Sequence, residues 1–161
     1  MDPHSSRANL GLAAALWAAG SVEEARGVFE RGLREFPKDA LHYQEYGRLL
    51  LSLAKGGDAA AESRAVALFT QALALNGRLS EAHYELGNLE LAKGRIAGAL
   101  EHLEQARGLE PELSKIRYAL SRAYRRAGRS AEAAEELRVY QQLKAAEEKA
   151  NPGFPAVSAQ R

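Results

Sequence analysis

The sequence predicts an all-α protein built from stacked pairs of helices, and three observations support this fold class. Alanine occurs 32 times and leucine 23 times in the 161 residues. Valine, isoleucine and threonine together supply only eight residues, although β-branched side chains favour strands. This composition excludes sheet-based domains, and with them the dinucleotide-binding and hydrolase folds that host many enzymes. The third observation is an internal repeat, which indicates that the helices are arranged in successive similar units.

Alanines paired with an aromatic residue or leucine four positions later mark this repeat. The pairs are Ala25 with Phe29, Ala65 with Phe69, Ala99 with Leu103, and Ala133 with Leu137. Successive pairs are 40, 34 and 34 residues apart, and Gly94 and Gly128 are also 34 apart. Several residue types therefore keep one register, which chance does not produce.

Each repeat is expected to contain two amphipathic helices joined by a tight turn. In the third repeat, Ala82, Leu86 and Leu89 lie on one face of the first helix. Gly94 suits the left-handed conformation of the turn, and Pro111 ends the second helix. One helix pair cannot bury its apolar stripe alone, so neighbouring repeats must stack.

The first repeat contains the apolar stretch Leu10–Ala19, which has the length of a signal-peptide core. Only Arg7 supplies positive charge before it, and Asp2 opposes that charge, so the positively charged region of a signal peptide is weak. Because the stretch also keeps the register of the repeat, we expect it to form the first helix. No apolar run is long enough to span a membrane, and we expect a cytoplasmic protein.

The second repeat carries six extra residues near its inter-helix turn, around residues 54–59. Either the two helices lengthen or a glycine-rich loop protrudes. In the fourth repeat the last helix is expected to run to about residue 150, where Pro152 and Pro155 prevent its continuation. Residues 151–161 form a tail that either is disordered or docks through Phe154 or Val157.

The period of 34, the Leu86–Gly87 pair, the turn glycine and the spacing of Ala99, Leu103, Ala106 and Pro111 resemble the tetratricopeptide (TPR) repeat. The resemblance implies a right-handed superhelical solenoid of four TPR-like helix-turn-helix repeats in a single array, residues 6–150. The four repeats cover about residues 6–39, 40–79, 80–113 and 114–147. Glu90 departs from the family pattern, which places an aromatic residue or leucine there. It either turns outward to pair with an arginine, or is a buried charge that specifies inter-repeat geometry.

The resemblance also implies that the first helices line a concave face that binds a peptide or helix of a protein partner. The corresponding positions are apolar in the first repeat and aromatic and basic in the last. They are Leu10, Ala14, Trp17, Gln44, Arg48, Leu51, Tyr84, Asn88, Leu91, Tyr118, Arg122 and Arg125, with Arg126 adjacent. A partner with an apolar end and an acidic end would suit this face.

Other interpretations of the same side chains stay open. Tyr84 and Tyr118 either contact a partner or support the packing, and the arginines either bind or form a solvated face paired with glutamates such as Glu81 and Glu112. Some TPR modules hold the C-terminus of chaperones with lysines and asparagines at these positions. Leu10 and Ala14 occupy the first set here, so chaperone-tail binding is not expected.

The composition favours no other chemistry. The net charge is +1, which gives no basic excess for nucleic acid or an anionic membrane, and there is no cysteine. His4, His42, His83 and His102 have no metal-ligand spacing, and phosphate-loop and nucleophile-elbow motifs are missing from the sequence. We therefore expect no cofactor, no metal and no catalysis. Arginine outnumbers lysine 16 to 6, which hints at a GC-rich bacterial genome.

The leading hypothesis is a protein-interaction adaptor, and two rivals remain. The first repeat has no preceding repeat to cover its apolar helix, so copies could self-assemble through the N-terminal helix or the tail. Alternatively the chain is a fragment of a larger protein, because Pro3 precedes Pro37 by one period of 34. RNA binding is a weaker third reading, since RNA-reading repeats need a basic surface.

Overall fold

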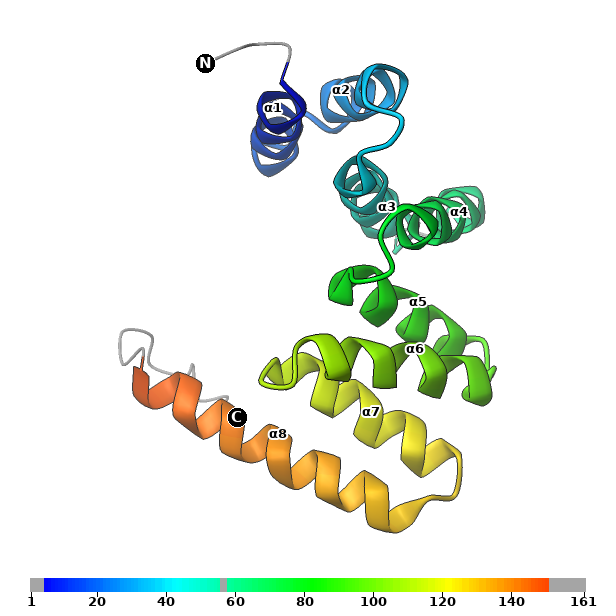
Figure 1. The fold of residues 1–161 in the computed structure, drawn as a ribbon, viewed down its shortest axis with the longest axis vertical. Coiled ribbons are helices and arrows are strands. Elements are labelled where there is room, and N and C mark those ends of the chain that lie inside the picture. Colours follow the sequence, from blue (N-terminus) through cyan, green and yellow to red (C-terminus); the bar gives the residue numbers. More distant parts are fainter. Residues whose placement is uncertain (1–4, 56–57, 151–161) are drawn as a thin grey trace, which may run out of the picture. The chain divides into compact units, whose positions relative to one another are not determined.

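The computed structural model describes residues 5–55 and 58–150, so Pro3, Phe154 and Val157 lie outside the described residues. The described residues form eight helices and no strand (Figure 1). The helices are α1 (Ser6–Ala18), α2 (Val22–Glu35), α3 (Ala40–Ala54), α4 (Ala59–Leu75), α5 (Ser80–Ala92), α6 (Ile96–Leu109), α7 (Ser114–Arg126) and α8 (Ser130–Ala150). The first helices begin at residues 6, 40, 80 and 114. The all-α fold of four helix-turn-helix repeats is thus confirmed, and Leu10–Ala19 lies almost entirely within α1.

Glycine makes the turns within the first, third and fourth repeats. Gly20, Gly94 and Gly128 have φ angles of 81°, 75° and 74°, in the left-handed region that residues with a Cβ avoid. The second repeat differs, because the extra residues lengthen its helices. α3 has 15 residues and α4 has 17, against 13 in α5 and 14 in α6. Asp58 then caps α4 by accepting hydrogen bonds from the amides of Ala60 and Ala61, each at 3.0 Å.

The chain forms two compact units, unit 1 (residues 1–86) and unit 2 (residues 87–161). α5 begins in unit 1 and ends in unit 2. That residues 6–150 form one continuous superhelical array stays a prediction. The core of unit 1 contains Ala13, Ala25, Val28, Phe29, Tyr46, Leu49, Leu50, Ala61, Ala65, Leu68, Phe69, Ala82 and Leu86. The buried apolar residues of unit 2 include Leu89, Leu91, Ala99, Leu103, Ala106, Ile116, Ala119, Leu120, Ala123, Tyr124 and Ala133.

Small residues let the two helices of a repeat approach closely, as the repeat pattern predicts. A Cβ added at Gly87 would lie 2.6 Å from Cγ of Leu103, which is far inside van der Waals contact. At Gly47 an added Cβ would lie 3.0 Å from the Phe69 ring. Each glycine therefore makes room for the large side chain of its own second helix.

In unit 1 the first and second repeats meet through aromatic rings. The Phe29 ring on α2 stacks on the Tyr46 ring on α3, with centroids 5.5 Å apart and planes 9° apart. The Tyr46 hydroxyl donates a hydrogen bond of 2.8 Å to Glu30. Burial and this hydrogen bond raise the pKa of Tyr46 to about 12.

In unit 2 the third and fourth repeats meet around a buried carboxylate. Glu136 on α8 accepts hydrogen bonds from Arg107 on α6 at 2.5 Å and from Arg117 on α7 at 3.0 Å. Its side chain is buried, and the two guanidinium groups compensate for the loss of its hydration.

Glu90 turns partly outward and forms a bidentate ion pair with Arg95. One of the two hydrogen bonds, from Nη2 to Oε1, measures 2.6 Å. The hydrogen bonds from Arg95 lower the pKa of Glu90. The interpretation of Glu90 as an outward carboxylate that pairs with an arginine is confirmed.

Candidate functional site

The predicted binding positions of unit 1 lie on the first helices α1, α3 and α5. Leu10 and Trp17 are half-buried on α1, whereas Ala14 is exposed. The Arg48 guanidinium on α3 lies over the Trp17 ring, 5.8 Å from its centroid. Arg48 also pairs with Glu45 at 2.8 Å and with Glu81 at 3.7 Å. Arg48 therefore connects the first helices to one another and is already engaged.

Gln44 is only 7% exposed, so it lies beneath this face of unit 1. Its Nε2 donates to Glu45 at 2.9 Å, while its Oε1 has no hydrogen-bond partner among the described residues. Buried acceptors usually have a hydrogen-bond partner, so this oxygen is an exception beneath the predicted face. Leu51 on α3 and Tyr84 on α5 are half-buried.

The predicted positions of unit 2 separate into supporting and exposed residues. Leu91 is 1% exposed, and its carbonyl oxygen accepts a hydrogen bond of 2.7 Å from Arg126. Asn88 is half-buried. Tyr118 is 45% exposed, and its ring rests against Tyr140 with centroids 5.2 Å apart. Leu91 and Arg126 therefore hold α5 and α7 together, whereas Tyr118 presents its ring to solvent.

Arg122 and Arg125 are two exposed cations of this face. They follow Tyr118 by four and seven residues on α7, so all three side chains share one side of the helix. Both arginines are exposed, and neither makes a hydrogen bond or ion pair with the described residues of unit 2. Arg117 and Arg129 differ, because Glu136 engages the first and Glu132 the second.

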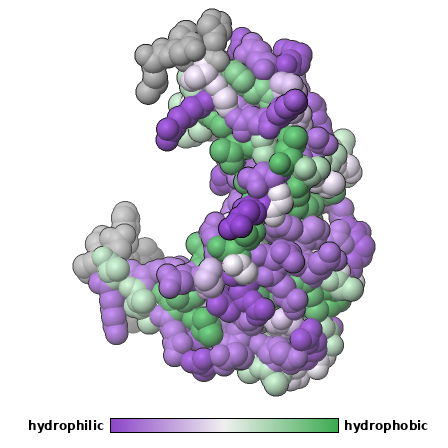
Figure 2. Space-filling model, in the orientation of Figure 1, coloured by the Kyte–Doolittle hydropathy of each residue, from purple (hydrophilic) through white to green (hydrophobic). Residues whose placement is uncertain are grey.

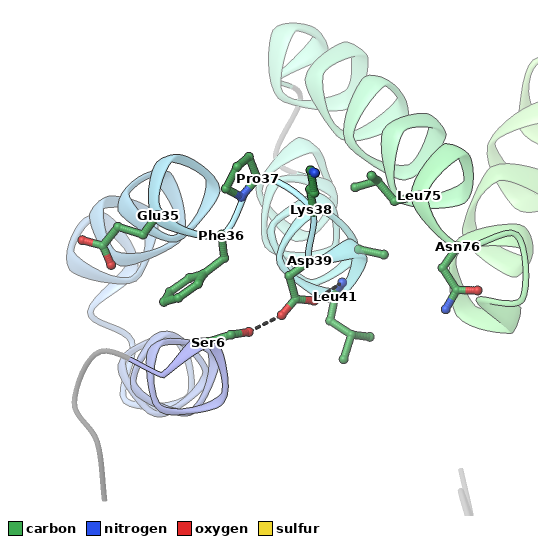
Figure 3. A pocket seen from close by; sticks show the side chains of 10 residues that line it. Ser6, Glu35, Phe36, Pro37, Lys38, Asp39, Leu41, Leu75 and Asn76 are labelled. Carbon is green, nitrogen blue, oxygen red and sulfur yellow. Dashed lines mark hydrogen bonds between the residues drawn. The ribbon is translucent and has the colours of Figure 1, made fainter.

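An open depression of about 710 Å³ lies in unit 1 where α2 ends and α3 begins (Figure 3). It is lined by Ser6, Glu35, Phe36, Pro37, Lys38, Asp39, Ala40, Leu41, Leu75 and Asn76. The Ser6 hydroxyl points toward Asp39 and donates a hydrogen bond to it, and Asp39 also accepts from the Leu41 amide at 3.0 Å. Burial opposes ionisation of Asp39, but these hydrogen bonds lower its pKa. Its carboxylate therefore links α1 to α3 through these hydrogen bonds.

Next to this depression, His42 is fully buried against Gly32. Its Nε2 lies 3.2 Å from Oδ1 of Asn9, and Phe36 stacks on its ring at 5.2 Å. Burial lowers the pKa of His42, although Asp39 acts to raise it. Sequence reasoning missed these contacts. The available signal was the separation of 33 residues in both pairs, Ser6 with Asp39 and Asn9 with His42, one less than the period.

Residues 5–55 and 58–150 contain neither a cluster of side chains that could hold a metal ion nor a helix that could span a membrane. Within these ranges no three His, Asp or Glu side chains are grouped closely enough to hold a metal ion. None of the helices in the described part of the chain combines the length and the apolar character that crossing a membrane requires. On the face drawn in Figure 2, hydrophobic surface forms separate patches within a largely hydrophilic surface.

Three family models of the tetratricopeptide repeat match the chain, at residues 6–49, 47–112 and 90–151. Together these ranges include every described helix. No curated protein matches the sequence at a significant level.

Solved structures of MamA proteins have a similar fold. One crystal structure of MamA is 20% identical, with a TM-score of 0.74 over 92% of this chain and 83% of that chain. A second is 21% identical, with a TM-score of 0.71 over 97% and 81%. Residues 41 to the end of MamA from Desulfovibrio magneticus RS-1 are 20% identical, with a TM-score of 0.71 over 90% and 78%. At such identities the likeness concerns the fold alone, whereas the family models match the sequence over its length. The chain belongs to the tetratricopeptide repeat family, whose repeats serve protein–protein interaction.

Proposed function

We propose that the protein is a non-catalytic adaptor that binds an acidic segment of a protein partner on the first-helix face of unit 2. The observation that carries this proposal is the side of α7 where Tyr118, Arg122 and Arg125 are exposed together. Two neighbouring guanidinium groups without a carboxylate partner repel each other, and an incoming carboxylate relieves that repulsion.

The chemistry of these side chains favours a peptide with carboxylates beside an apolar or aromatic residue. Arginine can hold a carboxylate through two parallel hydrogen bonds, which gives both affinity and orientation. The Tyr118 ring supplies a large contact area, and Tyr140 restrains it before binding. A restrained ring loses less entropy on binding, so the site is preorganised.

The first-helix face of unit 1 offers a separate, apolar surface for a partner. Leu10, Ala14 and Trp17 supply its apolar surface, and Leu51 extends it. In this proposal Tyr84 and Asn88 contribute contacts, whereas Arg48, Leu91 and Arg126 maintain the positions of the first helices.

Fluorescence polarisation with short labelled peptides tests the proposal. One peptide combines glutamates with leucines, and the other replaces each glutamate by lysine. The acidic peptide is expected to bind, and the double variant Arg122→Glu and Arg125→Glu is expected to weaken it at least about tenfold, because charge-assisted hydrogen bonds are lost. High salt should weaken binding in the same direction.

A matched control changes the same charges elsewhere. Arg31 and Arg34 are exposed on α2, outside the proposed face, so Arg31→Glu with Arg34→Glu should leave the affinity of the acidic peptide almost unchanged. An equal loss of peptide affinity in both double variants would mean that only the net charge matters, and would refute the site on α7.

A further inference from the structure

One position of α1 is exposed where its counterparts in every later repeat are buried. By the repeat spacing, Leu12 corresponds to Tyr46, Leu86 and Leu120. These three side chains are at most 5% exposed, whereas Leu12 is 52% exposed. Ala15, on the same side of α1, is also exposed, while its counterparts Leu49, Leu89 and Ala123 are buried.

One position of α8 departs from its counterparts in the complementary way. Leu137 corresponds to Phe29, Phe69 and Leu103, which are at most 1% exposed. Leu137 is 36% exposed and borders an open depression of about 240 Å³. The depression is lined by Ser121, Arg125, Ser130, Ala133, Ala134 and Leu137.

The contact between Phe29 and Tyr46 shows what these two positions do inside the chain. Phe29 corresponds to Leu137 and Tyr46 corresponds to Leu12, and their rings stack where the first repeat meets the second. Leu137 and Leu12 therefore occupy the two repeat positions that form this contact, but the described residues of the chain do not pair them with each other. One half of the contact, Leu12, lies on the first helix of the array and the other half, Leu137, on the last.

We propose that the exposed side of α1 in one molecule packs on α7 and α8 of a second copy of the same chain, through contact of Leu12 with Leu137. A second copy is the occupant because this chain carries both halves of the joint in the register that its own repeats use. The face is free of charge, since Arg7 is the only charged residue in α1. Burying it desolvates no ionised group of α1, and Arg125 is the one charged residue that lines the depression.

Side-chain volumes at the next position of the joint are also complementary. Within unit 1, Gly32 leaves room for the large side chain of His42. The counterparts of Gly32 and His42 at the joint between copies are Tyr140 and Ala8. Within unit 1 the second helix carries the small residue and the first helix the large one, whereas at the joint Tyr140 is large and Ala8 is small. The combined side-chain volume of the two positions is therefore similar.

Such a contact joins two different surfaces, so it is heterologous. Each copy leaves one free α1 and one free α8 face, and assembly continues into chains or closes into a ring. The joint borders the peptide site proposed above, because Arg125 lines the depression and Tyr140 contacts Tyr118. Leu12 and Leu137 themselves are not among the residues of that proposal.

Analytical ultracentrifugation of the full chain and of two single variants tests the inference. The average mass of the wild type is expected to rise with concentration. Leu12→Glu disables one half of the joint and Leu137→Glu the other, so each variant alone is expected to be monomeric. An equimolar mixture should form a heterodimer and nothing larger, because one intact half remains on each partner.

Two further variants keep the result interpretable. Ala134→Glu places a charge in the same depression from an exposed position, so it repeats the Leu137 test with little risk to folding. Leu75→Glu changes a leucine of similar exposure, 37%, on α4, and should assemble like the wild type. Circular dichroism verifies the helical content of each variant.

A wild type that stays monomeric at its highest soluble concentration would overturn the inference, and would point to an occupant other than a second copy. Assembly of the single variants to the wild-type extent, or a mixture without heterodimer, would equally refute the head-to-tail joint.

Discussion

The two units join successive repeats with different chemistry. In unit 1, α2 meets α3 through the stacked rings of Phe29 and Tyr46 and through the buried His42, whose pKa burial lowers. In unit 2, helices of the third and fourth repeats meet around the Glu136 carboxylate, which Arg107 and Arg117 share. The helix bounds of these repeats nevertheless follow one spacing.

This difference shows that the repeat specifies where helices meet and leaves the chemistry of the meeting to the individual residues. Stacked aromatic rings stabilise by burying area and by their geometry. A buried ion triad gains less net free energy, because desolvation offsets the attraction, but losing one partner is costly. Removing a single side chain from each contact in turn tests this difference.

The largest effect is expected from Tyr46→Ala in unit 1. Loss of the fully buried ring leaves a cavity beside Phe29 and should lower the free energy of unfolding by about 3–5 kcal/mol. Urea denaturation followed by the fluorescence of Trp17, the single tryptophan, measures this in unit 1. Tyr46→Phe retains the ring and loses only the hydrogen bond to Glu30, so it should cost about 1 kcal/mol. Similar costs for both substitutions would argue against ring packing as the main contribution.

The next effect is expected from Glu136→Gln in unit 2. The change leaves two guanidinium groups facing each other and should cost about 2 kcal/mol, less than for a fully buried pair because both arginines are partly exposed. Hydrogen exchange resolved by mass spectrometry should locate the loss of protection in unit 2. Glu135→Gln removes an exposed ion pair with Arg138 and should leave the stability almost unchanged, because solvent screens that pair. If both variants behaved alike, the buried triad would have no special role.

The smallest effect is a pH dependence confined to unit 1. Burial lowers the pKa of His42 below its ordinary value of 6.5, against the opposing influence of Asp39 and Glu35. As the pH falls through 6.5, the unfolded chain binds a proton that the folded chain resists, so stability should decrease until the lowered pKa is reached. Denaturation curves across this range, monitored by Trp17 fluorescence, should show a weaker decrease for His42→Gln. An equal decrease in that variant would assign the effect to other groups.

Much of the fold was predictable because the repeat is recorded in residue types. Gly94 and Gly128 mark turns, and the alanine pairs mark where second helices cross first helices, so the spacing of 34, 40 and 34 residues between first helices was expected. The outward pairing of Glu90 was one of two alternatives, and a neighbouring arginine at position 95 favoured it.

The candidate site was less predictable, because helical spacing places a residue on a face without indicating what covers it. Gln44 and Leu91 occupy the same repeat positions as residues such as Tyr118 and Arg125, yet both are buried. Their burial depends on neighbouring first helices, which differ from repeat to repeat. The Glu136 triad was missed for a related reason, since its three residues come from three helices and keep no common spacing.

The amino-acid sequence alone therefore established the fold class, the number of repeats and the positions of the turns, because these follow from local preference and periodicity. Tertiary structure was needed to decide which members of each periodic set are exposed. Burial is a property of neighbours, and the neighbours of Leu12 and Leu137 at the two ends of the array differ from those of their internal counterparts. The same repeat position is thus core within the chain and accessible surface at its ends.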